Sequence, residues 1–159
     1  GAEFGECLAL AQKLGRRVTY HGQVSHRRLA ALMKQAHLQV LPSFFEGLPL
    51  VLFEGLASGC RIIATKLSGF DEIFGQAKSD TIDLISLPPL ETIDRPFHKD
   101  VASLERALCE SIQKMVGRVR TAADIDDPGA DRIAAEYTWS RVFERTLSVY
   151  TEIVDRRSS

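Results

Sequence analysis

The apolar, β-branched run Arg61-Ile62-Ile63-Ala64-Thr65 constrains the fold of this chain more than any other feature. Such a run is typical of a strand that is buried on both faces of a parallel sheet. Similar short runs occur at Val18–His21, Leu38–Leu41 and Ile82–Ser86, and helical patterns separate them. This alternation, with its short connections, predicts an α/β fold: a doubly wound parallel sheet with helices on both faces.

The segments around these strands show the spacing of amphipathic helices. Ser25 is suited to cap the second helix, and Gly15 and Gly59 are suited to end the first and third. The stretch Pro88–His98 contains three prolines and is expected to be a loop. The helices are expected at residues 4–14, 26–36, 49–58, 72–74, 101–120, 130–137 and 140–157.

Bulk composition excludes several classes of protein. A net charge of -1 argues against general nucleic-acid binding, which favours a basic face. Cys7, Cys60 and Cys109 are odd in number and widely spaced, as in reduced thiols and unlike a disulfide framework. The longest apolar runs fall short of the ~20 residues that span a bilayer, and the N-terminus lacks the order of a signal peptide. A cytoplasmic location is therefore expected.

The segment from Glu46 to Glu54 places two carboxylates eight positions apart, with a glycine and a proline between them. Pro49 suits the first turn of a helix, and Gly47 gives a ligand room to approach the backbone. A loop carboxylate followed by a second one on the next helix can bind one hydroxyl-bearing ligand. The free N–H groups at the helix start would face an anionic part of it. This geometry predicts a nucleotide-sugar site.

Each carboxylate also has a purely structural interpretation. Glu54 could be a solvated helix residue, and Glu46 could stabilise the helix dipole. The apolar residues around Glu54 favour the functional interpretation, because an ionised group on a largely buried helix needs a partner. A carboxylate that accepts a hydrogen bond from a sugar hydroxyl gains about 1.5–3 kcal/mol.

No Lys or Arg occurs between Lys34 and Arg61. A diphosphate at the start of this helix would therefore interact with backbone amides and the helix dipole, without a local cation. Lys66 could reach the diphosphate, although a solvated loop lysine is the alternative. We expect the missing positive charge to lie outside this chain.

Asp124 and Asp126 superficially match an Asp-x-Asp motif that holds a divalent metal ion in another sugar-transferase architecture. They follow a basic amphipathic helix instead of a buried strand, and a Pro-Gly pair comes next. A solvated turn is the better interpretation, so no metal site is expected.

Ligands of α/β sheets bind beyond the carboxyl ends of the strands. Loops at residues 22–24, 43–47 and 66–69 follow predicted strands and should rim one crevice. This convergence is inferred from topology and requires no motif.

The stretches Val18–Val24, Leu41–Ser43 and Glu46–Gly59, with Gly69 and Glu72, carry a family resemblance. They resemble the C-terminal, donor-binding domain of family-4 retaining glycosyltransferases of GT-B architecture, the glycosyl transferases group 1. The resemblance implies a Rossmann-like nucleotide-sugar-binding domain, truncated at its N-terminus, over residues 1–129. Residues 130–159 would be helices that pack on this domain or toward an absent N-terminal domain.

The resemblance also implies roles for single residues. Glu46 would hold hydroxyls of the donor sugar and lie closest to the transferred sugar, and Glu54 would bind the ribose hydroxyls. Backbone N–H groups of Gly47 and Leu48 would contact the sugar and diphosphate. The implied donor-binding set is Gly22, Gln23, Val24, Ser43, Glu46, Gly47, Leu48 and Glu54, and no catalytic residue is assigned within the chain.

The expected function is donor binding in a hexosyltransferase that moves a sugar, with retention, to a glycan or lipid-linked acceptor in polysaccharide biosynthesis. The nucleotide-diphospho-sugar is a substrate, and the resemblance implies a metal-independent enzyme without a cofactor. The acceptor would bind the absent N-terminal domain, and peripheral membrane association of the full-length enzyme is compatible with such acceptors. The chain also lacks the segment with the family's Arg/Lys pair, so it is expected to be an inactive fragment.

Two other functions remain open from the sequence. A GT-B-fold sugar-nucleotide epimerase would need acid and base groups in the cleft, and the Leu-Ala-Ser-Gly sequence after Glu54 fits it less well. A non-catalytic nucleotide-sugar-binding or interaction module would have the same crevice without the chemistry.

Overall fold

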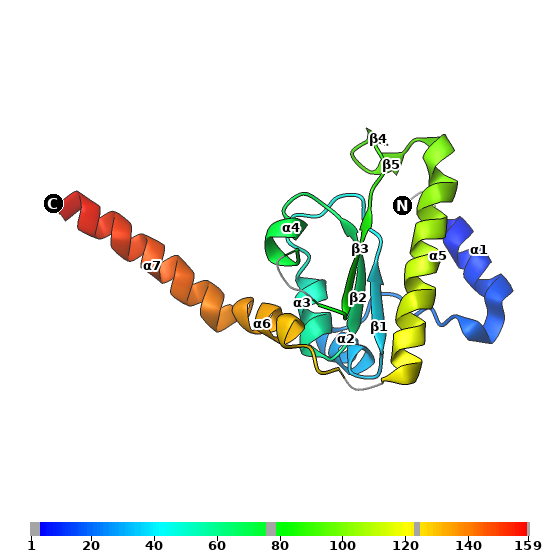
Figure 1. The fold of residues 1–159 in the computed structure, drawn as a ribbon, viewed down its shortest axis with the longest axis horizontal. Coiled ribbons are helices and arrows are strands. Elements are labelled where there is room, and N and C mark those ends of the chain that lie inside the picture. Colours follow the sequence, from blue (N-terminus) through cyan, green and yellow to red (C-terminus); the bar gives the residue numbers. More distant parts are fainter. Residues whose placement is uncertain (1–3, 76–78, 123–124, 159) are drawn as a thin grey trace.

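A parallel three-stranded sheet forms the centre of the molecule, seen here in a computed structural model (Figure 1). The structure describes residues 4–75, 79–122 and 125–158. The strands are β1 (Leu38–Leu41), β2 (Arg61–Lys66) and β3 (Ile82–Ser86), in the order β1-β2-β3. Both outer strands run parallel to β2, which confirms the predicted α/β class.

Helices cover both faces of this sheet, as a doubly wound fold requires. Helices α3 and α6 pack on one face, and the long α5 packs on the other (Figure 1). The helices are α1 (Phe4–Leu14), the 3-10 helix η1 (Gly15–Arg17), α2 (His26–Met33), α3 (Leu50–Ala57), α4 (Phe70–Ile73), α5 (His98–Thr121), α6 (Pro128–Glu136) and α7 (Trp139–Ser158).

The side chains of β2 alternate between two hydrophobic clusters. Ile62 and Ala64 belong to the cluster beneath α3 and α6, whereas Ile63 packs with Ile85 and Met115 beneath α5. Successive side chains of a strand point to opposite faces, so an uninterrupted apolar run is needed where both faces are covered. The central strand is therefore buried from both sides, as its sequence predicts.

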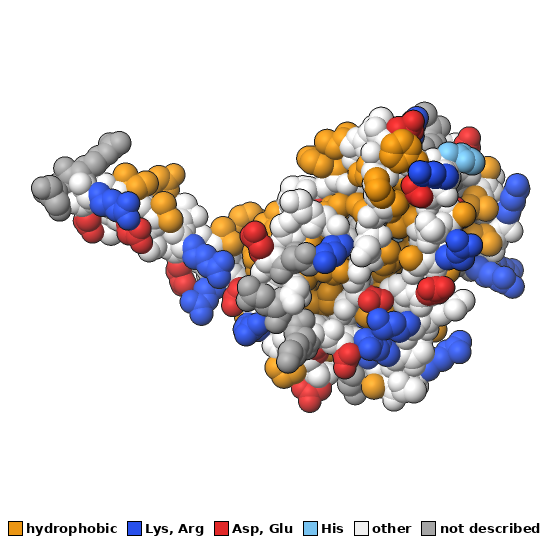
Figure 2. Space-filling model, turned by 45° about the horizontal axis from the view of Figure 1, so that its top comes forward, with side chains coloured by type: hydrophobic (Ala, Val, Ile, Leu, Met, Phe, Trp, Pro, Cys, Tyr) orange, Lys and Arg blue, Asp and Glu red, His pale blue; other side chains and the backbone are white. Residues whose placement is uncertain are grey.

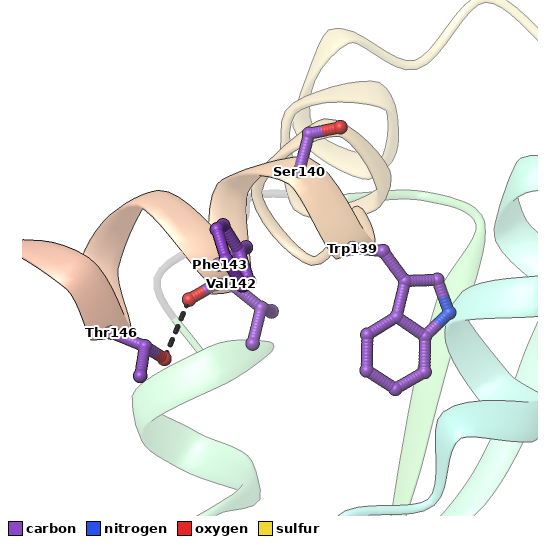
Figure 3. Close-up of a pocket in the computed structure, with 5 residues that line it drawn as sticks. All are labelled: Trp139, Ser140, Val142, Phe143 and Thr146. Atoms are coloured by element: carbon purple, nitrogen blue, oxygen red, sulfur yellow. Dashed lines mark hydrogen bonds between the residues drawn. The ribbon is translucent and has the colours of Figure 1, made fainter.

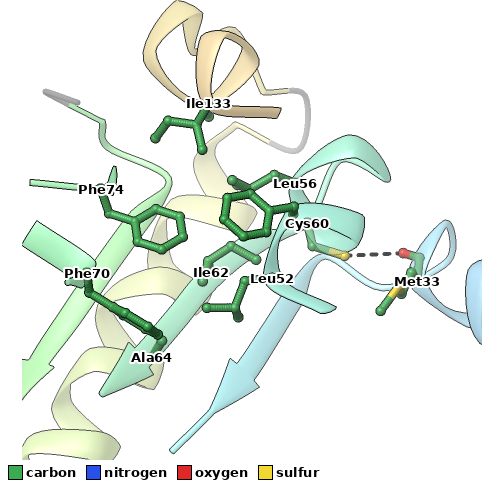
Figure 4. Packing of buried hydrophobic residues seen from close by; sticks show 11 residues of the cluster. Met33, Leu52, Leu56, Cys60, Ile62, Ala64, Phe70, Phe74 and Ile133 are labelled. Carbon is green, nitrogen blue, oxygen red and sulfur yellow. Dashed lines mark hydrogen bonds between the residues drawn. The ribbon is translucent and has the colours of Figure 1, made fainter. Parts of the chain in front are cut away.

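Aromatic side chains fill much of the larger cluster, which Figure 4 shows from close by. The Phe53 ring stacks on Phe74 with a centroid distance of 5.6 Å and on Tyr137 at 4.3 Å. These contacts join α3, the segment after α4 and the end of α6. Full burial of one such side chain stabilises a fold by about 1.5–3 kcal/mol.

Gly55 allows α3 to approach β1 closely. A Cβ atom at this position would lie 1.7 Å from Gln39 Oε1 and 3.2 Å from Ile62 Cδ1. Gln39 Nε2 also donates a hydrogen bond of 3.0 Å to the backbone oxygen of Val51, so the same side chain links β1 to α3. This contact fixes the position of the helix that carries Glu54.

The prediction of a strand at Val18–His21 is wrong. The backbone of Val18 is extended, but the segment pairs with none of the described strands, and Val18 and Tyr20 are 40% and 60% exposed. A strand persists only where a neighbour accepts and donates its backbone hydrogen bonds. The segment has residue types that favour a strand, but none of the described strands pairs with it.

The prediction of a loop at Pro88–His98 is also wrong in part. Strands β4 (Leu90–Thr92) and β5 (Arg95–Pro96) form a small antiparallel sheet there, and α5 begins at His98. Proline is tolerated because a two-stranded ribbon has a free edge on each strand.

Other boundaries differ by a few residues, which is usual for helix ends. Helix α2 ends at Met33 instead of Ala36, and α4 covers residues 70–73 instead of 72–74.

Asp127 anchors α6 to the sheet through five hydrogen bonds. Its Oδ1 accepts from the backbone N–H groups of Gly129 and Ala130, both at 3.0 Å, as an N-cap does. Its Oδ2 accepts from Ser79 Oγ at 2.7 Å, from Thr81 Oγ1 at 2.9 Å and from Thr81 N at 3.2 Å. Burial raises the pKa of this carboxyl, but the hydrogen bonds outweigh burial, and the net pKa is lowered.

We therefore expect Asp127→Asn to lower the free energy of unfolding by about 2–3 kcal/mol at pH 7, because the amide loses the charge and one acceptor. A group with a lowered native pKa stabilises the fold above its unfolded pKa and loses this effect as pH falls through the native value. The difference in free energy of unfolding between wild type and variant should thus shrink below about pH 4. Urea unfolding of both proteins at pH 7 and at pH 3 measures this difference.

The matched control is Asp131→Asn, at an exposed aspartate on the same helix. This variant should change the free energy of unfolding little at either pH. If both variants lose the same free energy of unfolding, Asp127 does not anchor α6 as described. A loss in Asp127→Asn that does not change with pH would also contradict this role.

Candidate functional site

The loop after β1 is tied to the end of β2. Thr65 Oγ1, buried on β2, donates a hydrogen bond to the backbone oxygen of Ser43. Ser43 Oγ in turn donates to Glu46 Oε1 at 2.7 Å. This chain of contacts runs from the buried strand to a half-buried carboxylate at the carboxyl edge of the sheet.

Glu46 is therefore held in place before any ligand binds. Within the described part of the chain, its second oxygen, Oε2, forms no hydrogen bond and can accept one from a hydroxyl. Gly47 and Leu48 follow it and are exposed, whereas Pro49 is buried at the position that caps α3. A ligand can thus reach both the carboxylate and the backbone beside it.

The N-terminus of α3 opens at the end of this loop. Pro49 forms no side-chain cap, and the first N–H group bonded inside the helix is that of Leu52, which donates to Pro49 O at 3.0 Å. Unpaired N–H groups and the positive end of the helix dipole favour an anion at such a position. An anionic group next to Glu46 would therefore have donors available.

Glu54 lies on the second turn of α3 and lines a cavity of about 280 Å³ between α2 and α3. The helix is largely buried, but the Glu54 side chain is exposed, so the argument that an ionised group at this position needs a partner is wrong. Among the described residues it forms no ion pair. Its carboxylate is therefore available to a ligand, and its position does not depend on a structural salt bridge.

The structure brings some of the predicted site residues together and leaves others apart. Ser43 and Glu46 are in direct contact, but neither lines the cavity that contains Glu54. The two glutamates lie at the two ends of a short segment, one before α3 and one along it. One extended ligand would have to run along the start of α3 to contact both.

The loop at residues 22–24 lies immediately before α2. Gly22 has a φ of +63°, a left-handed conformation that suits glycine. Gly22 and Gln23 are exposed and Val24 is half-buried. Ser25 then caps α2 by accepting a hydrogen bond of 3.3 Å from Arg28 N, so this loop leads directly into the helix that lines the Glu54 cavity.

Several residues of this cavity were missed by sequence reasoning. Leu29 and Met33 show the apolar helical spacing that is typical of a core-facing side of a helix, and no motif contains Ser58 as a site residue. The signal that could have found them is their position on the faces of α2 and α3 that meet each other. The missed residues are His26, Leu29, Ala30, Met33 and Ser58.

The described residues contain no group of three or more His, Cys, Asp or Glu side chains that could hold a metal ion. Asp126 is exposed, and Asp124 lies outside the described residues. Within the same residues, no helix has both the length and the apolar character needed to cross a membrane.

A sequence model of the family described as glycosyl transferases group 1 matches residues 2–82 of the 159. The matched range includes β1, α2, α3 and β2, together with both glutamates of the candidate site.

Several named proteins are similar to this chain. The alpha-maltose-1-phosphate synthase of Mycolicibacterium smegmatis is 21% identical over 126 residues, which cover 79% of this chain and 30% of the synthase. The MMP alpha-(1->4)-mannosyltransferase of Mycolicibacterium hassiacum is 26% identical over 133 residues, 84% of this chain and 28% of that protein. The putative teichuronic acid biosynthesis glycosyltransferase TuaC of Bacillus subtilis is 36% identical over 95 residues, 58% of this chain and 24% of that protein.

This chain thus spans 30% or less of the length of these relatives. The family match itself covers the helices and strands that position Ser43, Glu46 and Glu54. The chain belongs to the glycosyl transferases group 1 family, as its resemblance predicted.

Proposed function

We propose that this chain binds the nucleotide-diphospho-sugar donor of a retaining glycosyltransferase of GT-B architecture. The observation that carries the proposal is the pair of available carboxylates around the start of α3. Glu46 is held by Ser43 at the carboxyl edge of the sheet, and Glu54 faces a cavity of about 280 Å³. Open crevices at this edge of an α/β sheet are the usual place for ligands.

Glu54 binds the ribose hydroxyls of the donor in this proposal. Its cavity has an apolar wall of Leu29, Ala30 and Met33, and it also contains His26 and Ser58. An apolar pocket with a few polar groups is typical of a small-molecule site. The ribose would bind the carboxylate, and the nucleobase would extend toward the loop at residues 22–24.

Glu46 accepts hydrogen bonds from hydroxyls of the transferred sugar. Its bond to Ser43 fixes the carboxylate, so little side-chain entropy is lost when the sugar binds. The diphosphate lies between the two glutamates and accepts from the N–H groups of Gly47, Leu48 and the start of α3. Departure of the diphosphate is then helped by electrostatic stabilisation, and no metal ion is required.

The acceptor is a glycan or a lipid-linked sugar, bound by a separate N-terminal half that also supplies cations for the diphosphate. Relatives are named for maltose-1-phosphate synthesis, mannosyl transfer and teichuronic acid biosynthesis, and these names support a role in polysaccharide biosynthesis. Such donors occur in the cytoplasm, where we place the reaction.

Residues 1–129 form the donor-binding unit in this proposal, and the last two helices extend it. Ala130 and Ile133 of α6 lie in the larger core cluster, so α6 packs on the donor unit. Helix α7 projects away from the body, and Figure 2 shows hydrophobic side chains along one edge of it. The exposed apolar residues at helical spacing are Trp139, Phe143, Leu147, Tyr150 and Val154.

The first turns of α7 support its assignment as a packing surface. Trp139 is 79% exposed and Phe143 is 71% exposed, and both line a surface hollow of about 520 Å³. In Figure 3, Trp139 and Ser140 point to different sides of the helix. We propose that this apolar side packs toward the acceptor-binding half.

Replacement of Glu54 by Gln in the full-length protein should lower kcat/KM for sugar transfer by about 10- to 100-fold, because one charge-assisted hydrogen bond to ribose is lost. Transfer from a nucleotide-sugar, measured at subsaturating donor, gives this ratio. Glu110→Gln, at an exposed position of α5, is the matched control and should retain activity.

An unchanged kcat/KM in Glu54→Gln would contradict the donor-site assignment. Epimerisation of the nucleotide-sugar without transfer would favour an epimerase, and absence of both activities in the wild-type protein would favour a binding module.

The 159-residue chain alone should bind UDP-glucose or GDP-mannose weakly, with a Kd on the order of millimolar. The reason is that residues 35–60 contain no Lys or Arg to neutralise the diphosphate. Isothermal titration calorimetry measures the affinity. A micromolar Kd would contradict the proposal that the cations come from another part of the protein.

A further inference from the structure

The loop at residues 43–47, which carries Glu46, is held by few hydrogen bonds. Within the described part of the chain, no backbone–backbone hydrogen bond outside the helices and strands involves this loop. The side-chain hydrogen bonds that reach it there are the one from Thr65 Oγ1 to the backbone oxygen of Ser43 and the one from Ser43 Oγ to Glu46 Oε1. The position of the Glu46 carboxylate therefore depends on these two bonds and on the packing of the loop.

Thr65 lies where the pairing between β1 and β2 ends. The last paired residues are Leu41 and Ala64, and Pro42, which has no N–H group, follows Leu41. Thr65 is only 1% exposed, and its hydroxyl binds the next residue of the loop, Ser43. A side-chain bond thus continues the link between the two segments at the point where a proline ends the backbone ladder.

The surroundings of the Thr65 side chain are mostly apolar. It lines a cavity of about 280 Å³ between the end of β1 and α5, together with residues such as Phe44, Ile85 and Leu104. A polar group in apolar surroundings is costly unless it forms a hydrogen bond, so the bond to Ser43 is strongly favoured. Valine has the same branched shape as threonine and would remove the donor while it keeps the packing against Phe44.

The two glutamates of the candidate site are held by different parts of the fold. Glu54 stands on α3, and the close approach of Gly55 to Gln39 and the bond from Gln39 to α3 fix that helix against β1. The cavity that contains Glu54 shares no residue with the cavity that Thr65 lines. The Thr65 hydroxyl is therefore linked to Glu46 and not to Glu54.

We propose that Thr65 is a positioning residue for sugar transfer, which acts through Ser43 on Glu46. This inference rests on the proposed donor site, in which Glu46 binds hydroxyls of the transferred sugar. Thr65 does not contact the sugar itself, but it fixes the loop from which the free Glu46 Oε2 meets those hydroxyls. A misplacement of about 1 Å near the reacting atoms can lower a rate by about 100-fold, so a buried hydroxyl can matter for transfer.

Thr65→Val in the full-length protein should lower kcat/KM for transfer from UDP-glucose or GDP-mannose about tenfold, because Glu46 is no longer held in place. Thr65→Ser keeps the hydroxyl and should retain most of the activity. The matched control is Thr92→Val, which removes an exposed hydroxyl bonded to Asp94 and should transfer sugar as the wild type does. Thermal unfolding followed by circular dichroism checks that each variant is folded.

A double-mutant cycle distinguishes this role from a purely structural one. In a Glu46→Ala protein, Thr65→Val should change kcat/KM by no more than about twofold, because no carboxylate is left to misplace. In a Glu54→Gln protein, the same substitution should still cost about tenfold. A radiolabelled donor keeps the weak activity of the double variants measurable, and Thr65→Ala takes the place of Thr65→Val if that variant does not fold.

Three results would overturn the positioning role while the donor site stands: an unchanged kcat/KM in Thr65→Val, a loss in Thr65→Ser as large as in Thr65→Val, or the same loss from Thr65→Val with and without Glu46. An unchanged kcat/KM in Glu54→Gln contradicts the donor site itself, and the role of Thr65 then falls with it.

Discussion

Burial of β2 from both sides is the constraint on which the rest of the structure depends. Ile62 and Ile63 are both 0% exposed although they point to opposite faces of the sheet. Each face therefore needs its own helical layer, and α3 with α6 on one side and α5 on the other provide them. The end of the strand extends this rigidity to the candidate site, because Thr65 bonds the backbone of Ser43 and Ser43 bonds Glu46.

The parallel arrangement gives the two edges of the sheet different chemistry. Loops at the carboxyl edge expose carboxylates and unpaired N–H groups near the start of α3. The amino edge collects buried polar groups instead, with Asp127 saturated by hydrogen bonds and Arg61 only partly satisfied. A donor at the first edge would meet Glu46 Oε2, which forms no hydrogen bond within the described residues.

Much of the sheet was predictable from local sequence, and the failures share a physical cause. The bounds of β1 and β3 agree with their apolar runs, and Ser25 caps α2 as predicted. At Val18–His21 the same type of run forms no strand, because pairing depends on a neighbour that no local pattern specifies. The hairpin of β4 and β5 was missed because prolines exclude central strands but not the edges of a ribbon.

The candidate site was also predictable only in part from local sequence. The two glutamates were identifiable from their spacing around a Gly-Leu-Pro turn, but the exposure of Glu54 and the bond from Ser43 to Glu46 required coordinates. The cavity lining from α2 was missed because a helix face that packs on a neighbour and one that borders a cavity share the same apolar spacing.

The amino-acid sequence by itself determined the α/β class, the positions of the buried strands and the family, since these follow from periodicity and a specific motif along the chain. Tertiary structure alone decided which carboxylate is exposed, which segment finds a strand to pair with and which nitrogen of Arg61 is buried without a hydrogen bond. Those properties depend on groups that are distant in sequence and are brought within hydrogen-bonding distance only when the helices close over the sheet.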